Sequence, residues 1–260
     1  MIDFAHSLAG FFVGAVVGLT GVGGGSLMTP LLVLLFGIHP ATAVGTDLLY
    51  AAITKAGGTC IHARKGNVEW RIVRYLSLGS MPAAALTLIL VQVWAPGGMG
   101  NASRIITFAL GAALVLTAAA LIFRRRLRQW AHRNQGNQAA SPPRAWKTMA
   151  IGALLGVLVS ISSVGAGALG VTALFFLYPR LASHRIVGSD VAHAVPLALI
   201  AGCGHWLLGG VDWALLGALL LGSIPGIYLG STLSSRIPEH VLCPTLAFVL
   251  ALVGGRLIAF

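Results

Sequence analysis

Two aspartates lie inside long apolar stretches of this 260-residue sequence, where their carboxylates could do chemistry. Asp47 follows a Gly-Thr step, and Asp190 follows a Gly-Ser step. An ionisable side chain in the interior of a bilayer costs about 2.5–3.5 kcal/mol on insertion scales, so it is a candidate functional residue. Either carboxylate could carry a coupling proton. The structural alternative stays open, because Thr46 or Asp47 near a helix start is a common N-cap.

Other polar side chains accompany the two aspartates on the helices that these stretches predict. Lys55 lies eight residues after Asp47, on the same helix face, and Tyr50 lies beside that face. His193 takes the place of Tyr50 near Asp190. Lys55 is deep inside an apolar stretch, so it should face a cavity or an acid partner. Either Lys55 only neutralises Asp47, or Lys55 and His193 attract an anion; we favour the second interpretation.

Two glycine-rich segments interrupt the apolar stretches. They read Gly21-Val22-Gly23-Gly24-Gly25 and Ser163-Val164-Gly165-Ala166-Gly167. Each glycine costs about 0.5–1 kcal/mol in a helix interior relative to alanine, and unwound backbone at membrane depth is tolerated only where protein or a wet cavity surrounds it. Ser26 suits an N-cap, and a helix N-terminus favours a small oxyanion. The alternative to a binding site is a tight packing contact between helices.

Matching Cys-x-His pairs, Cys60/His62 and Cys203/His205, have the residue types of a metal site. On a helix, however, residues two apart point about 200° apart. In the topology favoured below, the two pairs also lie at opposite membrane faces. We therefore expect no metal site and no cofactor. The sequence has no GxxxxGK[ST], GxSxG or HExxH motif, so we expect neither a nucleotide site nor an enzyme.

The elements that must position these residues are membrane helices. Hydrophobic residues make up 57% of the chain and charged residues 9%, against about 25% charged in soluble domains. The sequence predicts an all-α polytopic membrane protein with about eight to ten membrane segments. The apolar runs are 7–20, 26–37, 41–62, 72–94, 104–123, 148–162, 166–179, 186–207, 213–235 and 241–259.

The two halves of the chain repeat each other. Val44-Gly-Thr-Asp47 matches Val187-Gly-Ser-Asp190, and Gly79-Ser-Met-Pro82 matches Gly222-Ser-Ile-Pro225. Both matches have the spacing that separates Asp47 from Asp190, which we call the repeat offset, and the glycine-rich segments match at a spacing one position shorter. We therefore divide the chain into a first transmembrane repeat, a basic cytoplasmic linker and a second transmembrane repeat. Their bounds are 1–123, 124–147 and 148–260.

The positive charges predict how these repeats are oriented. The net charge is +11, and most Lys and Arg residues lie between apolar runs, which indicates membrane topology and not nucleic-acid binding. With five segments in each half and inverted repeats, fourteen positives are cytoplasmic. A parallel arrangement with four spans in each half places twelve there. We therefore favour tandem inverted repeats, each with a Gly-broken pair of short helices and three full spans.

The sequence resembles the sulfite exporter TauE/SafE family, also called the TSUP transporters. The resemblance covers about residues 8–258 and rests on three motifs and their second-half copies. The motifs are Gly18-Leu-Thr-Gly-Val-Gly-Gly-Gly-Ser-Leu-Met-Thr-Pro30, Gly37-Ile-His-Pro-Ala-Thr-Ala-Val-Gly-Thr46 and Gly66-Asn-Val-Glu-Trp70. The family commonly has Ser after the Gly-Thr step, where both halves here carry Asp. A carboxylate there suits a dianion poorly unless it is protonated, bridged by a metal or paired with Lys55.

This resemblance implies a multi-pass protein of the bacterial inner membrane that moves a small sulfur-containing or organic anion, such as sulfite or a sulfonate. Proton coupling and alternating access are part of that expectation, with an uncoupled facilitator or a membrane scaffold or enzyme subunit as alternatives. The expected partners are the anion, protons and lipid, with a homo-oligomer left open. The expected substrate site consists of Gly21, Gly23, Gly24, Gly25, Ser26, Thr46, Asp47, Tyr50, Lys55, Ser163, Gly165, Gly167, Ser189, Asp190 and His193.

Overall fold

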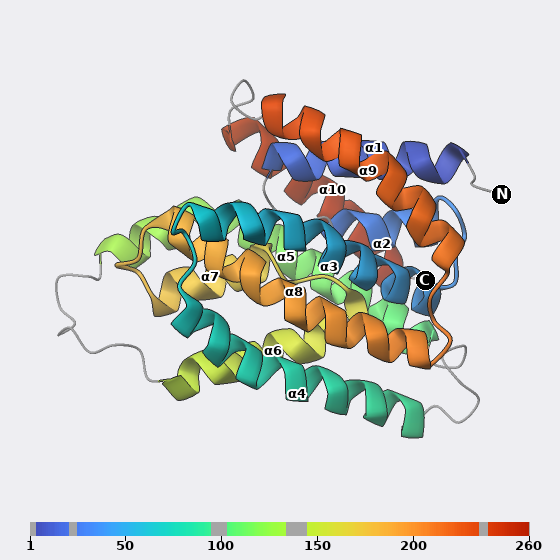
Figure 1. Ribbon diagram of the computed structural model, residues 1–260, viewed down its shortest axis with the longest axis horizontal. Coiled ribbons are helices and arrows are strands. Elements are labelled where there is room, and N and C mark those ends of the chain that lie inside the picture. Colours follow the sequence, from blue (N-terminus) through green and yellow to red (C-terminus); the bar gives the residue numbers. More distant parts are fainter. Residues whose placement is uncertain (1–3, 21–24, 95–102, 134–144, 234–238, 260) are drawn as a thin grey trace.

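The computed structural model describes residues 4–20, 25–94, 103–133, 145–233 and 239–259, and within these ranges the chain forms ten α-helices and no strand (Figure 1). The predicted all-α class is confirmed. The first five helices are α1 (Phe4–Thr20), α2 (Gly25–Leu34), α3 (Pro40–Arg64), α4 (Trp70–Trp94) and α5 (Ser103–Arg133). The next five are α6 (Ala145–Ser162), α7 (Ala168–Leu177), α8 (Ser183–Leu207), α9 (Trp213–Leu233) and α10 (Glu239–Ala259).

Several of these helices have the length and apolar composition of a membrane span. Among the described residues, five pass that test, and they are α4, α5, α6, α8 and α9. Large apolar side chains on their outer surfaces are exposed, including Leu86, Leu154 and Leu221. Exposed apolar surface on this scale is typical of a face that contacts lipid. The multi-pass membrane character is therefore supported by composition and by surface, while the number of spans stays a prediction.

Each half contains one very short helix after its glycine-rich segment. Helices α2 and α7 have 10 residues each, which gives a length of about 15 Å at 1.5 Å per residue, half of a hydrocarbon core of about 30 Å. The predicted helix restart in the first half lies at Gly25, one residue before Ser26. The predicted interruption of the second half is present between α6 and α7. Neither helix is therefore long enough to cross such a core by itself.

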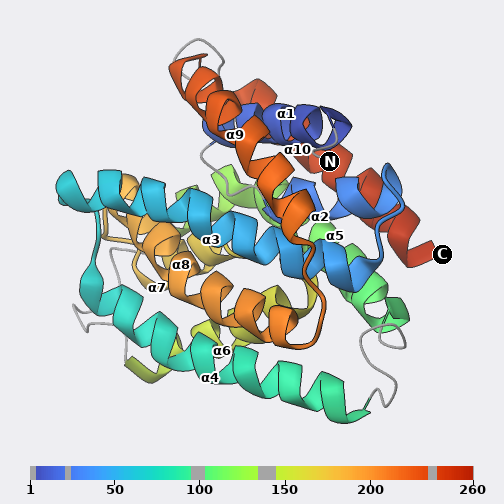
Figure 2. The ribbon, with the colours of Figure 1, turned by 45° about the vertical axis from the view of Figure 1, so that its right-hand side comes forward.

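Helices α3 and α8 form the centre of the fold and pack against each other in opposite directions. Gly45, near the start of α3, contacts His205 at the end of α8, whereas Gly188, near the start of α8, contacts His62. Figure 2 shows the two helices between the α1/α9 pair and the α4/α6 pair. Apolar side chains of both, such as Leu48 and Leu197, share one buried core. The two Cys-x-His positions consequently lie at opposite ends of this central pair.

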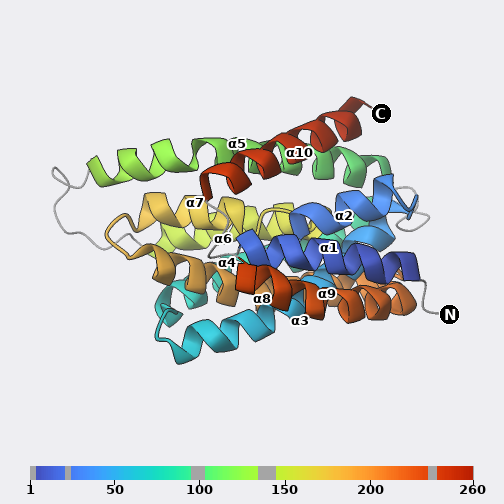
Figure 3. The same cartoon turned by 90° about the horizontal axis from the view of Figure 1, so that it is seen from above.

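The outer helices pack through matching small residues in the two halves. Gly10 and Gly14 of α1 approach the backbone of α9, and their counterparts Gly152 and Gly156 of α6 approach the backbone of α4 in the same way. Small residues allow this close contact between membrane helices. Figure 3 shows α5 beside α10, where Gly111 and Gly254 meet; these glycines are also related by the repeat offset.

This matched packing accords with two halves related by a twofold arrangement. The orientation of each half in the membrane stays a prediction, as do the three bounds that divide the chain into two repeats and a linker. Part of the predicted linker is helical, because α5 continues to Arg133 and α6 begins at Ala145.

Candidate functional site

The first predicted aspartate is held at the meeting point of the two halves. Asp47 is fully buried on α3. Its Oδ2 atom accepts a hydrogen bond of 2.5 Å from the Thr29 hydroxyl of α2 and one of 2.9 Å from the Ser163 hydroxyl. Its Oδ1 atom has no hydrogen-bond partner among the described residues. The carboxylate of the first repeat thus binds the glycine-rich segment of the second, and it is not a cap for its own helix.

Lys55 binds the same segment. Its Nζ atom donates a hydrogen bond of 3.0 Å to the carbonyl oxygen of Ala166. The ammonium group is near enough to both Asp47 and Asp190 for electrostatic interaction, but within the described part of the chain it forms no ion pair with either carboxylate. Lys55 and Asp47 therefore do not form the internal pair that one of the two interpretations expected. Asp47 and Lys55 of the first half thus bind unwound backbone of the second half.

The segment between α6 and α7 has the backbone that its glycines predict. Gly165 and Gly167 have φ values of 123° and 129°, which side chains rarely permit. Ser163 has a φ of 59°, and a left-handed conformation costs a residue with a Cβ about 1–2 kcal/mol. In this conformation the Ser163 hydroxyl lies within hydrogen-bonding distance of Asp47 Oδ2. Strained non-glycine backbone that is fixed by its surroundings is a common property of functional sites.

The second aspartate lies against the start of α7. Asp190 is 1% exposed, and both of its carboxylate oxygens lack hydrogen-bond partners among the described residues. The carboxylate faces Gly170, because a Cβ added to that glycine would lie 3.0 Å from the Asp190 Cγ and 3.5 Å from its Oδ2, and closer still to its Oδ1. Leaving a buried polar group unpaired costs about 1–3 kcal/mol, and more for a charged group. An ionised Asp190 carboxylate is therefore costly in this position.

Tyr50 and His193 lie at equivalent positions on the two central helices, and both are buried. The His193 Nε2 atom and the Ser80 hydroxyl of α4 are 2.8 Å apart and share a hydrogen bond. The Tyr50 hydroxyl interacts with the side chain of Ser223, the repeat counterpart of Ser80. The His193 Nδ1 atom has no partner among the described residues, so His193 places one unsatisfied polar atom three residues from Asp190.

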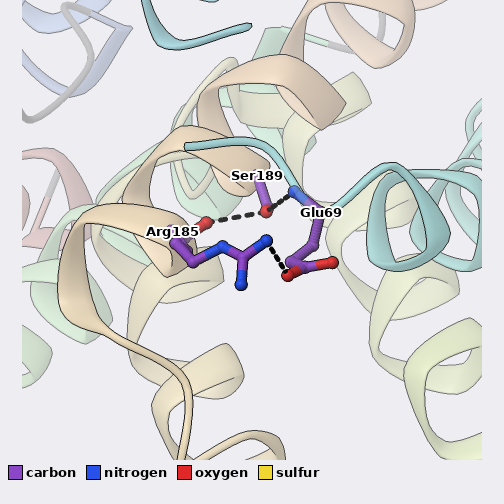
Figure 4. A network of polar contacts seen from close by, with 3 residues as sticks. All are labelled: Glu69, Arg185 and Ser189. Carbon is purple, nitrogen blue, oxygen red and sulfur yellow. Dashed lines mark hydrogen bonds and ion pairs between the residues drawn. The ribbon is translucent and has the colours of Figure 1, made fainter. Parts of the chain in front are cut away.

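The hydroxyls of Thr46 and Ser189 bind the loops at opposite ends of the central helices. Thr46 Oγ1 accepts a hydrogen bond of 3.1 Å from the Asp212 N–H. Ser189 Oγ accepts one of 2.8 Å from the Glu69 N–H and donates to the carbonyl of Arg185 (Figure 4). Arg185 also forms an ion pair of 2.6 Å with Glu69. These two predicted substrate residues thus tie each central helix to a loop of the other half, and their substrate role stays a prediction.

The predicted site residues of the first glycine-rich segment are only partly covered. Gly21, Gly23 and Gly24 lie outside the described residues, and Gly25 and Ser26 form the first turn of α2. The structure brings together Asp47, Lys55 and Ser163 and places Asp190 near them. We use the name midplane cluster for Thr29, Asp47, Lys55, Ser163, the carbonyl of Ala166 and Asp190.

Comparison with known proteins assigns the chain to a family. A model of the sulfite exporter TauE/SafE family matches residues 7–257. The chain belongs to the TauE/SafE family. A probable membrane transporter protein of Bacillus subtilis strain 168, YjnA, is 41% identical over 251 residues, which are 96% of this chain and 98% of that protein. A second protein of that strain with the same description, YdhB, is 27% identical over 255 residues, which are 96% and 97% of the two chains. No solved structure matches the chain at a significant level.

As a TauE/SafE protein, this chain is a membrane transporter. Its relatives include a probable membrane transporter protein of Xylella fastidiosa strain 9a5c, which is 27% identical over 209 residues, 80% of this chain and 75% of that protein. The resemblance found in the glycine-rich motifs is thus confirmed over nearly the whole length.

Sequence reasoning missed three side-chain contacts in this TauE/SafE chain. Thr29, Ser80 and Gly170 contact Asp47, His193 and Asp190 respectively. A signal for two of them was present. Thr29 has Thr172 as its counterpart at the repeat offset, and Ser80 has Ser223 within the repeated Gly-Ser-x-Pro motif. Polar residues that recur at the repeat offset within apolar runs would have identified Thr29 and Ser80 as candidate site residues.

Proposed function

We propose that this TauE/SafE transporter moves a small anion across the bacterial inner membrane by alternating access, coupled to protons that Asp47 and Asp190 carry. One observation carries the proposal. Asp47 and Lys55 of the first repeat both bind the unwound segment of the second repeat, through Ser163 and Ala166. A rearrangement between the halves must therefore break or make bonds at the charged residues.

The chemistry of the midplane cluster suits an anion accompanied by a proton. Lys55 provides one positive charge, and the start of α7 adds the positive end of a helix dipole. Two carboxylates beside one ammonium leave a net negative charge when both are ionised, which opposes an incoming anion. Protonation of a carboxylate removes that opposition. Coupling therefore follows from electrostatic balance within a membrane interior, where unpaired charge is costly.

The test is flux in liposomes that contain the purified protein. Uptake of labelled sulfite, thiosulfate, sulfonates and carboxylates is measured with and without an imposed pH gradient. We expect the wild type to take up at least one of these anions faster when the gradient is imposed. The Asp47→Asn and Asp190→Asn variants should insert normally but lose this increase in uptake rate. Asp212→Asn is the matched control, since Asp212 is an exposed carboxylate whose Oδ1 accepts hydrogen bonds from the Ala214 and Leu215 N–H groups at the start of α9.

The outcomes separate the alternatives. Anion flux that ignores the pH gradient in the wild type would indicate an uncoupled facilitator. Gradient-dependent flux that survives in both aspartate variants would assign the coupling to other residues. Thermal stabilisation of the purified protein by the same anions identifies the ligand, since the stabilisation grows as the anion concentration exceeds its dissociation constant.

A further inference from the structure

We infer that the carboxylate of Asp190 and the transported anion compete for one place, the first turn of α7 beside Lys55, so that the anion binds only after Asp190 has taken up a proton. This inference rests on the proposed function and specifies how its site works. It also assigns the substrate class, a small oxyanion with a single negative charge.

The Asp190 carboxylate faces Gly170, in the first turn of α7. The Gly170 and Val171 N–H groups bond back to the carbonyls of Gly165 and Gly167. The Asp190 carboxylate therefore lies beside the start of α7 without accepting a hydrogen bond from these N–H groups, and the positive end of the α7 dipole favours its negative charge.

The Asp190 carboxylate is buried, and neither of its oxygens has a hydrogen-bond partner among the described residues. Buried carboxylates usually accept hydrogen bonds, and Asp47 accepts two, from Thr29 and Ser163. The Asp190 carboxylate is therefore a group that an incoming anion can replace without breaking a hydrogen bond to a described residue.

The charged side chains near Asp190 determine how its negative charge is balanced. Among the groups on the helices packed against α8, Lys55 of α3 is the one whose charge acts on Asp190. Helix α7 has no titratable side chain. The other titratable groups of the packed helices, in α3, α4 and α6, are Asp47, Tyr50, Cys60, His62, Arg64, Arg71, Arg74, Tyr75 and Lys147. On α8 itself they are His184, Arg185, His193, Cys203 and His205. The Lys55 ammonium group thus provides the positive charge for both the Asp190 carboxylate and the bound anion.

Charge balance gives the substrate class. A monoanion that replaces an ionised Asp190, once Asp190 is protonated, leaves the net charge of the midplane cluster unchanged. A dianion adds one negative charge that no described side chain balances. Because an uncompensated charge in the membrane interior costs several kcal/mol, a singly charged sulfonate or carboxylate should bind in preference to sulfate.

The experiment measures binding of methanesulfonate and sulfate to the purified full-length protein by calorimetry between pH 5 and pH 8. Methanesulfonate keeps one charge and sulfate keeps two over this range, so the ligands do not titrate. In the wild type we expect the dissociation constant of methanesulfonate to increase up to tenfold per pH unit, which is the dependence for one linked proton. In Asp190→Asn it should be the same at pH 5 and pH 8. Sulfate should bind the wild type at least tenfold more weakly.

Two further variants complete the design. Asp190→Ser removes the carboxylate with a smaller polar side chain, and it gives a second reading if Asp190→Asn does not fold. Asp212→Asn should keep the pH dependence of the wild type. An Asp190 variant that folds and retains the pH dependence of the wild type overturns the inference, as does a wild type that binds methanesulfonate equally at all pH values. Either result leaves the proposed anion transport standing. Absence of binding by the wild type even at pH 5 would instead contradict the proposed anion site, and the inference with it.

Discussion

Replacing Gly45 by alanine should loosen one end of the central α3/α8 pair. A Cβ at Gly45 would lie 2.8 Å from the Cβ of His205 and closer still to the carbonyl oxygen of Gly210. Carbon atoms pack at about 3.5–4.0 Å, so the two segments must separate by at least about 0.7 Å, the difference between 3.5 and 2.8 Å. A movement of that size takes the 3.1 Å bond between the Asp212 N–H and Thr46 Oγ1 beyond hydrogen-bonding distance.

The free energies can be combined into one expected value. Overpacking costs about 1–3 kcal/mol, and leaving the buried Thr46 hydroxyl unpaired costs about 1–3 kcal/mol. Alanine in a helix returns about 0.5–1 kcal/mol relative to glycine. The net loss of stability is therefore about 1–5.5 kcal/mol, with a central value of about 3 kcal/mol. At about 2–4 °C per kcal/mol, the relation for globular domains of this length, the central value corresponds to a fall in melting temperature of about 6–12 °C.

Tryptophan fluorescence during heating of the detergent-purified protein measures this change. Gly57→Ala is the matched control, because Gly57 lies on the same helix, is exposed, and has nothing within 4 Å of the Cβ position. We expect Gly57→Ala to melt at or above the temperature of the wild type. Equal melting temperatures for the two alanine variants would refute the close approach of α3 to the end of α8.

Two further predictions concern the residues that join the halves. Ser163→Gly relieves a φ of 59° while removing the hydroxyl from Asp47, so it should be about 1–2 kcal/mol more stable than Ser163→Ala, with pH-coupled flux reduced in both. Identical melting curves for the two variants would contradict the strained conformation. The side chains of Arg185 and Glu69 are 42% and 28% exposed, so Arg185→Gln should cost about 0.2–1 kcal/mol, and less in high salt. Ser189→Ala should cost about 1–3 kcal/mol because a buried hydroxyl is lost; the opposite order of melting temperatures would count against this account.

Much of the fold could be predicted from the sequence because its cause is local. Apolar runs of membrane length favour helices, and the glycines at 165 and 167 lower the local stability of a helix. The shortness of α2 and α7 followed from the same signals. The duplication at the repeat offset is a property of the letters themselves, and it predicted which elements would have equivalent places.

The partners of the charged residues could not be predicted in this way. The sequence placed Lys55 near Asp47 on one helix and left open an internal pair, whereas the Lys55 ammonium binds the Ala166 carbonyl. Thr46 and Ser189 looked like substrate contacts because they precede the aspartates, yet their hydroxyls bind loops of the other half. Helical spacing determines which side chains share a face. It does not determine what lies opposite that face.

The sequence by itself therefore determined that this is a duplicated, polytopic TauE/SafE protein with an aspartate in each half and unwound backbone between short helices. Only the tertiary structure decided that Asp47 is bound by one hydroxyl from α2 and one from the segment between α6 and α7, and that Asp190 faces the start of α7 without a partner among the described residues. The physical reason is the range of the interactions. Helix formation depends on neighbours within a few residues, but these contacts join separate elements, from 18 positions apart for Thr29 and Asp47 to 116 for Ser163 and Asp47, and they exist only once those elements have packed together.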